Sequence, residues 1–331
     1  MSFLTIQTLT KHFVAKDSFG GSRKVLKAVD GIDFSLGEEN IFALVGESGC
    51  GKSTVARLIL RLIRPTSGKI FFRGKDIWEL RGEALKDFRR TVQIIFQDPF
   101  ASLNPRKTVF ETLSEPLRIH RLAERRAQRG IVSDLLRKVG LDQDVLNRYP
   151  HEFSGGQRQR ICIARALAVS PKLIVADEPL SALDVSIQAQ ILNLLREIKE
   201  QSGLSFLFIS HDLNVVYYFS EAVAVMYLGK IVEKSRTEEL FRKPLHPYTE
   251  ILLSAAPQIT AETAEAGLTR HKEVIRGEVP SPIDIPTGCP FHPRCPKRFD
   301  PCDTIVPRLE EPISRGYSER VVSCHLWNSY S

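Results

Sequence analysis

Short apolar runs alternate along the chain with segments in which apolar residues recur every three or four positions. The short runs are rich in β-branched and aromatic residues, end in loop residues and occupy 41–45, 92–96, 173–176 and 204–209. Continuous runs of this length are typical of parallel strands buried on both faces. Within 52–63 the spacing is i, i+3, i+4 and i+7, which predicts one face of a helix built from Val55, Leu58, Ile59 and Leu62. Alternating strands and helices predict an α/β fold with a largely parallel sheet.

Two segments depart from this alternation before residue 150. The N-terminal part predicts short strands at 4–6 and 28–36, joined by a turn-rich connection at 17–22. Residues 99–149 are polar and helical in pattern, so we predict a helical subdomain of about 99–165 inserted into the α/β core. Its arginines lack interleaved aromatics, and this favours a solvated helical face over a nucleic-acid surface. The group that lies close together comprises Arg118, Arg121, Arg125, Arg126 and Arg129.

The composition shifts again after residue 257. Residues 258–268 are small and polar like a linker, and prolines become dense from 279 onward, which disfavours regular helix or sheet. A small segment with little apolar content needs a staple to become ordered. We therefore expect two domains, a large one at 1–257 and a small proline-rich one at 258–331.

Composition limits the class of protein without choosing a ligand. The 331 residues are 43% hydrophobic and 26% charged, which excludes wholesale disorder, collagen and coiled coil. No apolar run approaches the ~20 residues of a membrane span, and the first residues do not resemble a secretion signal, so residence in the cytoplasm is expected. A net charge of +7 suits nucleic acid, an anionic membrane surface or phosphorylated ligands equally.

The first motif with chemical content lies between the strand at 41–45 and the helix at 52–63. It fits the phosphate-loop pattern G-x-x-x-x-G-K-S/T in the required strand-to-helix context. Glycines let backbone N–H groups converge on phosphate oxygens, and the helix N-terminus adds positive potential. We expect Lys52 to reach the β- and γ-phosphates of ATP and the Ser53 hydroxyl to ligate Mg²⁺. The motif comprises Gly46, Glu47, Ser48, Gly49, Cys50, Gly51, Lys52, Ser53 and Thr54.

A second strand, 173–176, ends in two carboxylates, Asp177 and Glu178. On its own the pair would be a strand that ends at an acidic turn. Beside a phosphate loop it predicts phosphoryl-transfer chemistry, which needs positioning and charge stabilisation more than covalent steps. Asp177 would hold Mg²⁺ through water, and Glu178 would orient and polarise the attacking water.

The run Ser154, Gly155, Gly156 and Gln157 opens a helical pattern shortly before the strand with the two carboxylates. In isolation it would be a helix N-cap with Ser154 as the capping residue. In this position it closely resembles the signature motif of the ATP-binding cassette (ABC) ATPases.

Further residues match the same family. Gln97 resembles the Q-loop glutamine, which implies that it ligates Mg²⁺ and takes part in catalysis, and His211 resembles the switch histidine, which implies a catalytic role. Asp184, at the end of 181–184, resembles the D-loop aspartate. Phe13 resembles the aromatic on which adenine stacks, with His12 and Phe19 as alternatives.

The resemblance covers residues 4–257 and implies a P-loop ATPase with a RecA-like core, an antiparallel β subdomain and a helical subdomain. It further implies that two cassettes dimerise head to tail, with ATP between the phosphate loop of one and the 154–157 run of the other. Since part of the γ-phosphate's environment comes from the partner, ATP would hold the dimer together and hydrolysis would release it. No core position departs from the pattern, so this chain is expected to supply both halves of an active site.

Three segments narrow the family. Residues 97–105 resemble the segment after the Q-loop in dipeptide and oligopeptide importers, and so do 246–255 and 277–296. Together they resemble the ATPase subunits of the peptide/nickel uptake family, with 46–57 closer to the F-type of its two paralogous ATPases.

Four of the six cysteines crowd into the C-terminal segment, with the spacing C-x5-C-x6-C-x21-C. Clustered thiols in a cytoplasmic chain indicate a metal site rather than disulfides. Zinc sites usually bring cysteine pairs two to four residues apart, whereas four thiolates also hold a 4Fe–4S cluster. The family resemblance favours the cluster, in a structural role, with Zn²⁺ as the alternative. The expected ligands are Cys289, Cys295, Cys302 and Cys324, with His292 and His325 as possible substitutes.

The leading hypothesis is therefore the ATP-hydrolysing subunit of a peptide importer, peripheral at the cytoplasmic face of the inner membrane. Its partners would be a second ATPase subunit (a paralogue or a copy of itself), two membrane permease subunits and, indirectly, an extracytoplasmic solute-binding protein. Nickel chelates are an alternative solute. Alternatives of another class are a soluble ABC ATPase acting on nucleic acid and an iron–sulfur sensor that uses ATP as a ligand. The first would need two cassettes or long coiled coils, and the second would lack hydrolytic residues such as Glu178 and His211.

Overall fold

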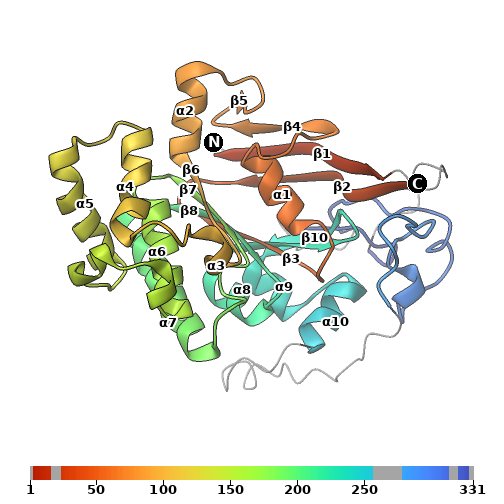
Figure 1. The fold of residues 1–331 in the computed structure, drawn as a ribbon. Helices are drawn as coiled ribbons and strands as arrows, with labels where there is room; N and C mark the ends of the chain where they lie inside the picture. Colours follow the sequence, from red (N-terminus) through yellow and green to blue (C-terminus); the bar gives the residue numbers. More distant parts are fainter. Residues whose placement is uncertain (1–2, 16–23, 256–277, 313–319, 328–331) are drawn as a thin grey trace. The chain divides into compact units, whose positions relative to one another are not determined.

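The computed structural model describes residues 3–15, 24–255, 278–312 and 320–327 (Figure 1). The chain divides into two compact units. Unit 1 comprises 1–3, 36–40 and 75–209, and unit 2 comprises 4–35, 41–74 and 210–331. The linker expected at 258–268 and the connection expected at 17–22 lie outside the described residues.

Unit 1 contains a parallel sheet. Strands β6 (Val92–Ile95), β7 (Leu173–Asp177) and β8 (Ser205–Ser210) follow one another in that order, with Val92 opposite Leu173 and Leu173 opposite Ser205. Every residue of β7 and β8 is buried. The continuous apolar runs therefore form the doubly covered parallel strands that they predict. A two-residue strand, β5 (Lys75–Asp76), also belongs to this unit.

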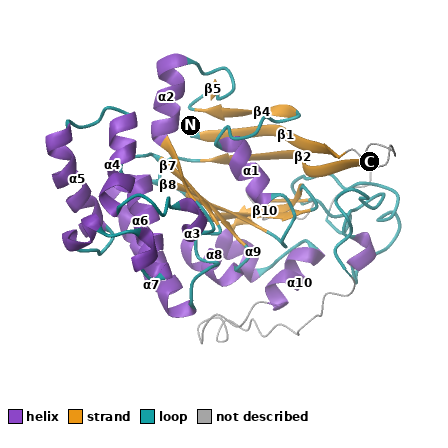
Figure 2. Cartoon of the chain, viewed as in Figure 1, coloured by secondary structure: helices purple, strands orange, loops and turns teal. Residues whose placement is uncertain are grey.

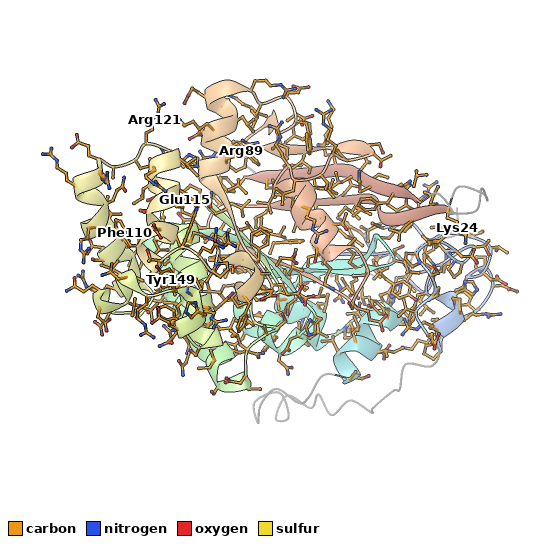
Figure 3. All side chains as sticks on the ribbon, in the orientation of Figure 1. Lys24, Arg89, Phe110, Glu115, Arg121 and Tyr149 are labelled. Atoms are coloured by element: carbon orange, nitrogen blue, oxygen red, sulfur yellow. The ribbon has the colours of Figure 1, made fainter. Side chains whose placement is uncertain are left out.

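Helices make up the rest of unit 1, and Figure 2 shows α4 to α7 gathered together. Their bounds are α2 Gly82–Thr91, α3 Pro99–Ser102, α4 Val109–Ile119, α5 Arg125–Lys138, α6 Gly155–Leu167 and α7 Val185–Ser202. Two 3₁₀ turns, η1 (Gln143–Asn147) and η2 (Pro150–Glu152), join α5 to α6. The helical character expected of 99–149 is confirmed. The five arginines that lie close together at 118–129 are all exposed, and Figure 3 shows Arg121 pointing away from the ribbon.

Unit 2 contains two strand systems. In the first, β1 (Leu4–Ala15) lies between β2 (Lys24–Leu36) and β4 (Ser67–Phe72), and it runs antiparallel to β4. The second has the order β11 (Val321–Val322), β10 (Lys230–Arg236), β9 (Ala222–Tyr227) and β3 (Ile41–Val45). Only the β3–β9 pair of this second system is parallel. The fold is thus of the expected α/β type with an antiparallel β part.

The helices of unit 2 are α1 Lys52–Ile59, α8 Leu213–Phe219, α9 Thr237–Arg242 and α10 Pro247–Ala255, with a 3₁₀ turn η3 at His292–Arg294. The helix predicted over 52–63 was too long. It ends at Ile59 because Arg61 takes a left-handed conformation with φ 56°, and Leu62 is 59% exposed rather than on the buried face. Apolar spacing continues through such a turn, so it does not reveal where the helix ends.

Between 278 and 312, η3 is the only helical turn in the described chain, which agrees with the proline density of that segment. No helix among the described residues is long and apolar enough to cross a bilayer.

A buried ion pair fixes the last described segment to β10. Arg320 and Glu233 are 1% and 0% exposed, and the Arg320 Nη2 donates to Glu233 Oε1 over 2.5 Å and to the carbonyl of Lys243. Glu233 also accepts from the backbone N–H of Leu245 at 2.9 Å and of His246 at 3.0 Å. The carboxylate therefore joins three segments of unit 2, and its burial is compensated by several donors.

Replacing Arg320 by Met leaves this carboxylate buried without its partner charge. We expect the free energy of unfolding, measured by urea denaturation, to fall by about 3 kcal/mol. The matched control is Arg137→Met, which removes an exposed Arg137–Asp134 pair (76% and 64%) and should change the midpoint hardly at all. An unchanged midpoint in Arg320→Met would show that the pair does not anchor this segment.

Candidate functional site

The predicted phosphate loop joins β3 to α1 and can be built only with glycine at two of its positions. Gly46 and Gly51 have φ of 151° and 109°. A Cβ on Gly46 would lie 2.2 Å from the carbonyl oxygen of Met226, and one on Gly51 would lie 2.0 Å from that of Ala28. The backbone of the loop therefore packs directly on neighbouring backbone, as an anion-binding turn requires.

Lys52 lies at the centre of this loop. It is 4% exposed, and its Nζ donates to the carbonyls of Gly46 at 2.8 Å and Glu47 at 3.1 Å. The loop thus holds the lysine by its own backbone, at the N-terminal end of α1, where the helix dipole favours anions.

Cys50 fills space inside the same loop. Its Sγ lies 3.9 Å from Lys52 Nζ and 2.9 Å from the place that a Cβ on Gly46 would take. Burial raises the pKa of its thiol and outweighs the nearby Lys52, which lowers it. A buried thiol held neutral is a poor nucleophile, so the surroundings of Cys50 favour a packing role over a reactive one.

In unit 1, β7 delivers both carboxylates. Asp177 is its last residue and is 8% exposed, whereas Glu178 begins the following turn with a left-handed φ of 46°. The Gln97 Nε2 donates to Glu178 Oε2 over 3.1 Å, although the two residues are 81 positions apart. The structure therefore brings together the predicted Q-loop glutamine and the glutamate predicted to orient the attacking water.

The run at 154–157 forms the N-terminus of α6. Ser154 and Gln157 make a reciprocal capping box: Ser154 Oγ accepts from Gln157 N (3.3 Å) and Gln157 Oε1 accepts from Ser154 N (3.1 Å). A Cβ on Gly156 would lie 2.6 Å from Ile187, in the first turn of α7. The N-cap reading is thus correct locally, and the glycine is needed where two helix ends approach.

Asp184 caps α7 beside this run. Its carboxylate accepts from the backbone N–H of Ile187 at 3.0 Å and from the Ser186 hydroxyl at 2.8 Å. These hydrogen bonds, the Ile187 bond foremost, hold the pKa of Asp184 below its usual value. Asp184 and the 154–157 run are therefore rigid neighbours at the start of two helices.

The remaining two candidates lie in unit 2. His211 follows β8 and is exposed, directly before Asp212, which caps α8 through Asn214 N at 2.9 Å. Phe13 is 40% exposed, with Lys11 Nζ 5.0 Å from its ring centroid. His12, by contrast, has its Nε2 3.0 Å from Asp30 Oδ1, and Phe19 lies outside the described residues.

All four C-terminal cysteines line one pocket of unit 2 (Cys289, Cys295, Cys302 and Cys324). Three of them are 8% exposed, and none forms a disulfide. Burial, together with the neighbouring thiols, raises the pKa of Cys289 to about 11 and that of Cys324 to about 12. Within the described chain, no three His, Cys, Asp or Glu side chains gather as closely as a single bound ion requires.

Three histidines also line this pocket, and the backbone engages each of them. His292 Nδ1 lies 3.0 Å from the carbonyl of Cys289, and His325 Nε2 lies 2.9 Å from that of Ile305. His246 Nδ1 accepts from Tyr248 N at 3.0 Å, and burial lowers the pKa of His246 to about 3. These contacts engage one ring nitrogen of each histidine, so His292 and His325 remain possible substitutes for a cysteine ligand.

One ion pair beside the phosphate loop could not be predicted from the sequence. Arg294 forms a two-pronged ion pair with Glu47, and both of its distances are below 3 Å. The only sequence signal was an arginine placed between two of the clustered cysteines, and that position gives no hint of a contact with the loop.

Comparison with known proteins agrees with this geometry. Residues 29–181 match the family described as ABC transporter, and residues 232–302 match the oligopeptide/dipeptide transporter C-terminal region. The probable peptide ABC transporter ATP-binding protein y4tS of Sinorhizobium fredii is 48% identical over 98% of this chain and 90% of its own length. The dipeptide transport ATP-binding protein DppF of Escherichia coli is 44% identical over 96% of this chain and 92% of its own.

Solved structures support the same assignment. The dimeric post-hydrolysis state of the ATP-binding cassette MJ0796 bound to ADP and Pi has a TM-score of 0.63 and 27% identity, over 71% of this chain and 98% of that one. Clostridium perfringens cbiO1, part of the transporter complex cbiONQ, has a TM-score of 0.62 and 25% identity, over 73% and 91%. The chain therefore belongs to the ATP-binding subunits of ABC transporters, and it is an ABC-type ATPase.

Proposed function

We propose that this ATPase drives the uptake of di- and oligopeptides through separate membrane subunits. The observation that carries the proposal is the joint presence of a complete cassette and a C-terminal segment that matches the oligopeptide/dipeptide transporter region over 232–302. Relatives over nearly the whole chain are named as peptide, oligopeptide and dipeptide transport ATP-binding proteins. Nickel chelates are the alternative cargo, since the cassette itself does not touch the solute.

The proposed nucleotide chemistry uses ATP and Mg²⁺. Lys52 and the loop N–H groups bind the β- and γ-phosphates, while Ser53 and Asp177 hold Mg²⁺, the latter through water. Glu178 orients and polarises the attacking water, and its bond to Gln97 supports this role because it fixes the carboxylate beside the predicted Mg²⁺ ligand. His211 completes the γ-phosphate environment. Adenine stacks on Phe13, a choice supported by its exposure and by the contact of His12 with Asp30.

The proposed assembly is a head-to-tail pair of cassettes, formed with a paralogue or with a second copy. The capped 154–157 run of one subunit faces the nucleotide on the loop of the other, and Asp184 lies at that junction. Two permease subunits and, indirectly, an extracytoplasmic solute-binding protein complete the importer, at the cytoplasmic face of the membrane. We keep the domain division at 257/258 as part of this proposal.

We also propose that the four cysteines hold a 4Fe–4S cluster. A single Zn²⁺ draws its ligands tightly together, whereas a cluster spreads four thiolates over four separate irons. The pocket supports a group that the four thiols share, because all four of them line it. Bound iron would favour the thiolate forms that burial alone opposes. The cluster would cross-link a proline-rich segment that has little core of its own.

Replacing Glu178 by Gln removes the proposed base and keeps its size. We expect steady-state ATP hydrolysis to fall at least about 100-fold, while ATP binding persists and traps the closed dimer. Phosphate release and light scattering with Mg-ATP measure the two effects. Glu200→Gln, on the exposed side of α7, is the matched control. Wild-type turnover in Glu178→Gln would remove Glu178 from this role.

Anaerobic purification should give a brown chain with a broad absorption at about 400 nm and about four irons per chain. Cys302→Ser should lower the absorption and the iron content, because the cluster loses one of its four ligands. Cys162→Ser, which changes a buried cysteine outside the pocket, should leave them unchanged. A colourless chain that carries one zinc would defeat the cluster and leave the ATPase assignment intact.

Deleting the gene should abolish uptake of a radiolabelled tripeptide as completely as deleting a partner permease. Plasmid-borne wild type should restore uptake, and the Glu178→Gln variant should not, because transport needs hydrolysis. Uptake of an unrelated free amino acid is the control. If the deletion leaves tripeptide uptake unchanged and abolishes nickel accumulation, the transported solute is a nickel chelate and not a peptide.

A further inference from the structure

An ion pair joins the phosphate loop to the four-cysteine segment. Arg294 ends η3, between Cys289 and Cys295, and Glu47 is the second residue of the loop. Arg294 Nη1 donates to Glu47 Oε2 over 2.8 Å, and Nη2 donates to Oε1 over 2.9 Å. The arginine and glutamate side chains are 5% and 21% exposed. A two-pronged, largely desolvated pair of this kind fixes the direction of the carboxylate as well as its charge.

A second, uncharged connection holds the backbone of the same residue. Glu47 N donates to the Tyr248 hydroxyl over 2.9 Å. Tyr248 packs on Tyr227 and Phe291, with ring centroids 4.7 Å and 5.3 Å apart, and Phe291 lines the cysteine pocket. All three rings are at most 1% exposed. Glu47 is therefore positioned at its carboxylate and at its amide by groups packed around the cysteine pocket.

The charge of Glu47 links this ion pair to the binding of phosphate groups. A carboxylate within a phosphate-binding loop repels a polyanion unless a cation neutralises it. Arg294 supplies that cation. The carbonyl of Glu47 also accepts from Lys52 Nζ, so a shift of Glu47 moves a direct partner of the lysine proposed to contact ATP. Arg294 reaches the nucleotide only through Glu47 and Lys52.

The position of Arg294 depends in turn on the cysteine segment. Cys289 N donates to the carbonyl of Cys302 over 2.8 Å, and Arg294 N donates to that of Phe291 over 3.0 Å. Little other regular structure holds this stretch in the described chain. Disturbing the cysteines therefore displaces the guanidinium from the two oxygens that it spans.

We propose that Arg294 is a positioning residue of the phosphate loop, through which the order of the four-cysteine segment sets the affinity for ATP. The proposal rests on the nucleotide and cysteine sites proposed above. It gives the C-terminal segment a regulatory connection to the cassette in addition to its own stability.

The first test measures the dissociation constant of a fluorescent ATP analogue on the full chain, purified anaerobically. Arg294→Met should weaken binding about tenfold, because the charge of Glu47 is left uncompensated, while kcat at saturating ATP changes little. Arg294→Lys keeps the charge and should lie between wild type and Arg294→Met. The matched control is Arg126→Met, which removes the exposed Arg126–Glu124 pair (87% and 73%) at the start of α5, outside the four-cysteine segment, and should bind like wild type.

Charge neutralisation predicts a rescue that general loss of structure does not. The double variant Glu47→Gln/Arg294→Met should recover most of the lost affinity, since no unpaired carboxylate remains in the loop. Hydrogen exchange of residues 46–54 should rise in Arg294→Met and return toward wild type in the double variant. Wild-type affinity in Arg294→Met, or no recovery in the double variant, would overturn the proposal.

The connection to the cysteines is tested by a double-mutant cycle. Cys302→Ser should weaken analogue binding in the wild-type background and have little further effect in the Arg294→Met background. Equal weakening in both backgrounds, or none in either, would show that the cysteines do not act through Arg294. Lys52→Ala separates the two levels of proposal. If Lys52→Ala leaves analogue binding intact, the proposed nucleotide site itself is wrong. If Lys52→Ala abolishes binding but Arg294→Met does not weaken it, only the inference about Arg294 fails.

Discussion

The course of the phosphate loop depends on how closely its backbone packs against neighbouring backbone in unit 2. At Gly46 and Gly51 the loop backbone lies so close to the carbonyls of Met226 and Ala28 that no Cβ fits between them. The loop therefore has no room to adopt another conformation. That constraint turns the loop carbonyls of Gly46 and Glu47 toward Lys52, at the N-terminal end of α1 where the helix dipole favours anions. The apolar, fully buried strand β3 supplies the rigid base from which the loop departs.

The candidate residues of unit 1 are held in place by hydrogen bonds rather than by close backbone packing. β7 ends in two carboxylates, Gln97 restrains one of them, and two reciprocal hydrogen bonds hold Ser154 and Gln157 at a helix start. Each functional side chain thus comes from the end of a buried strand or the first turn of a helix. Such positions combine a fixed backbone with an exposed polar group, which phosphoryl transfer requires because it depends on positioning.

Local patterns could predict much of this. The apolar runs identified β3, β7 and β8 because parallel strands buried on both faces contain few polar residues, and the motifs identified the loop, the two carboxylates and the 154–157 run. The end of α1 could not be predicted, since Arg61 adopts a left-handed conformation and no glycine there marks the end of the helix in the sequence. The Arg294–Glu47 pair was equally invisible, because it joins residues 247 positions apart and no periodicity links them.

The left-handed backbone of Glu178 has a consequence for how this protein can change. A glutamate at φ 46° carries steric strain of about 1 kcal/mol that glycine or asparagine would largely avoid. On the role proposed for Glu178, screens for thermal tolerance alone would therefore favour replacing it and would select chains that have lost ATP hydrolysis. Consensus and stability-guided engineering of such cassettes should hold this position fixed, since it is a place where the most stable sequence and the working sequence diverge.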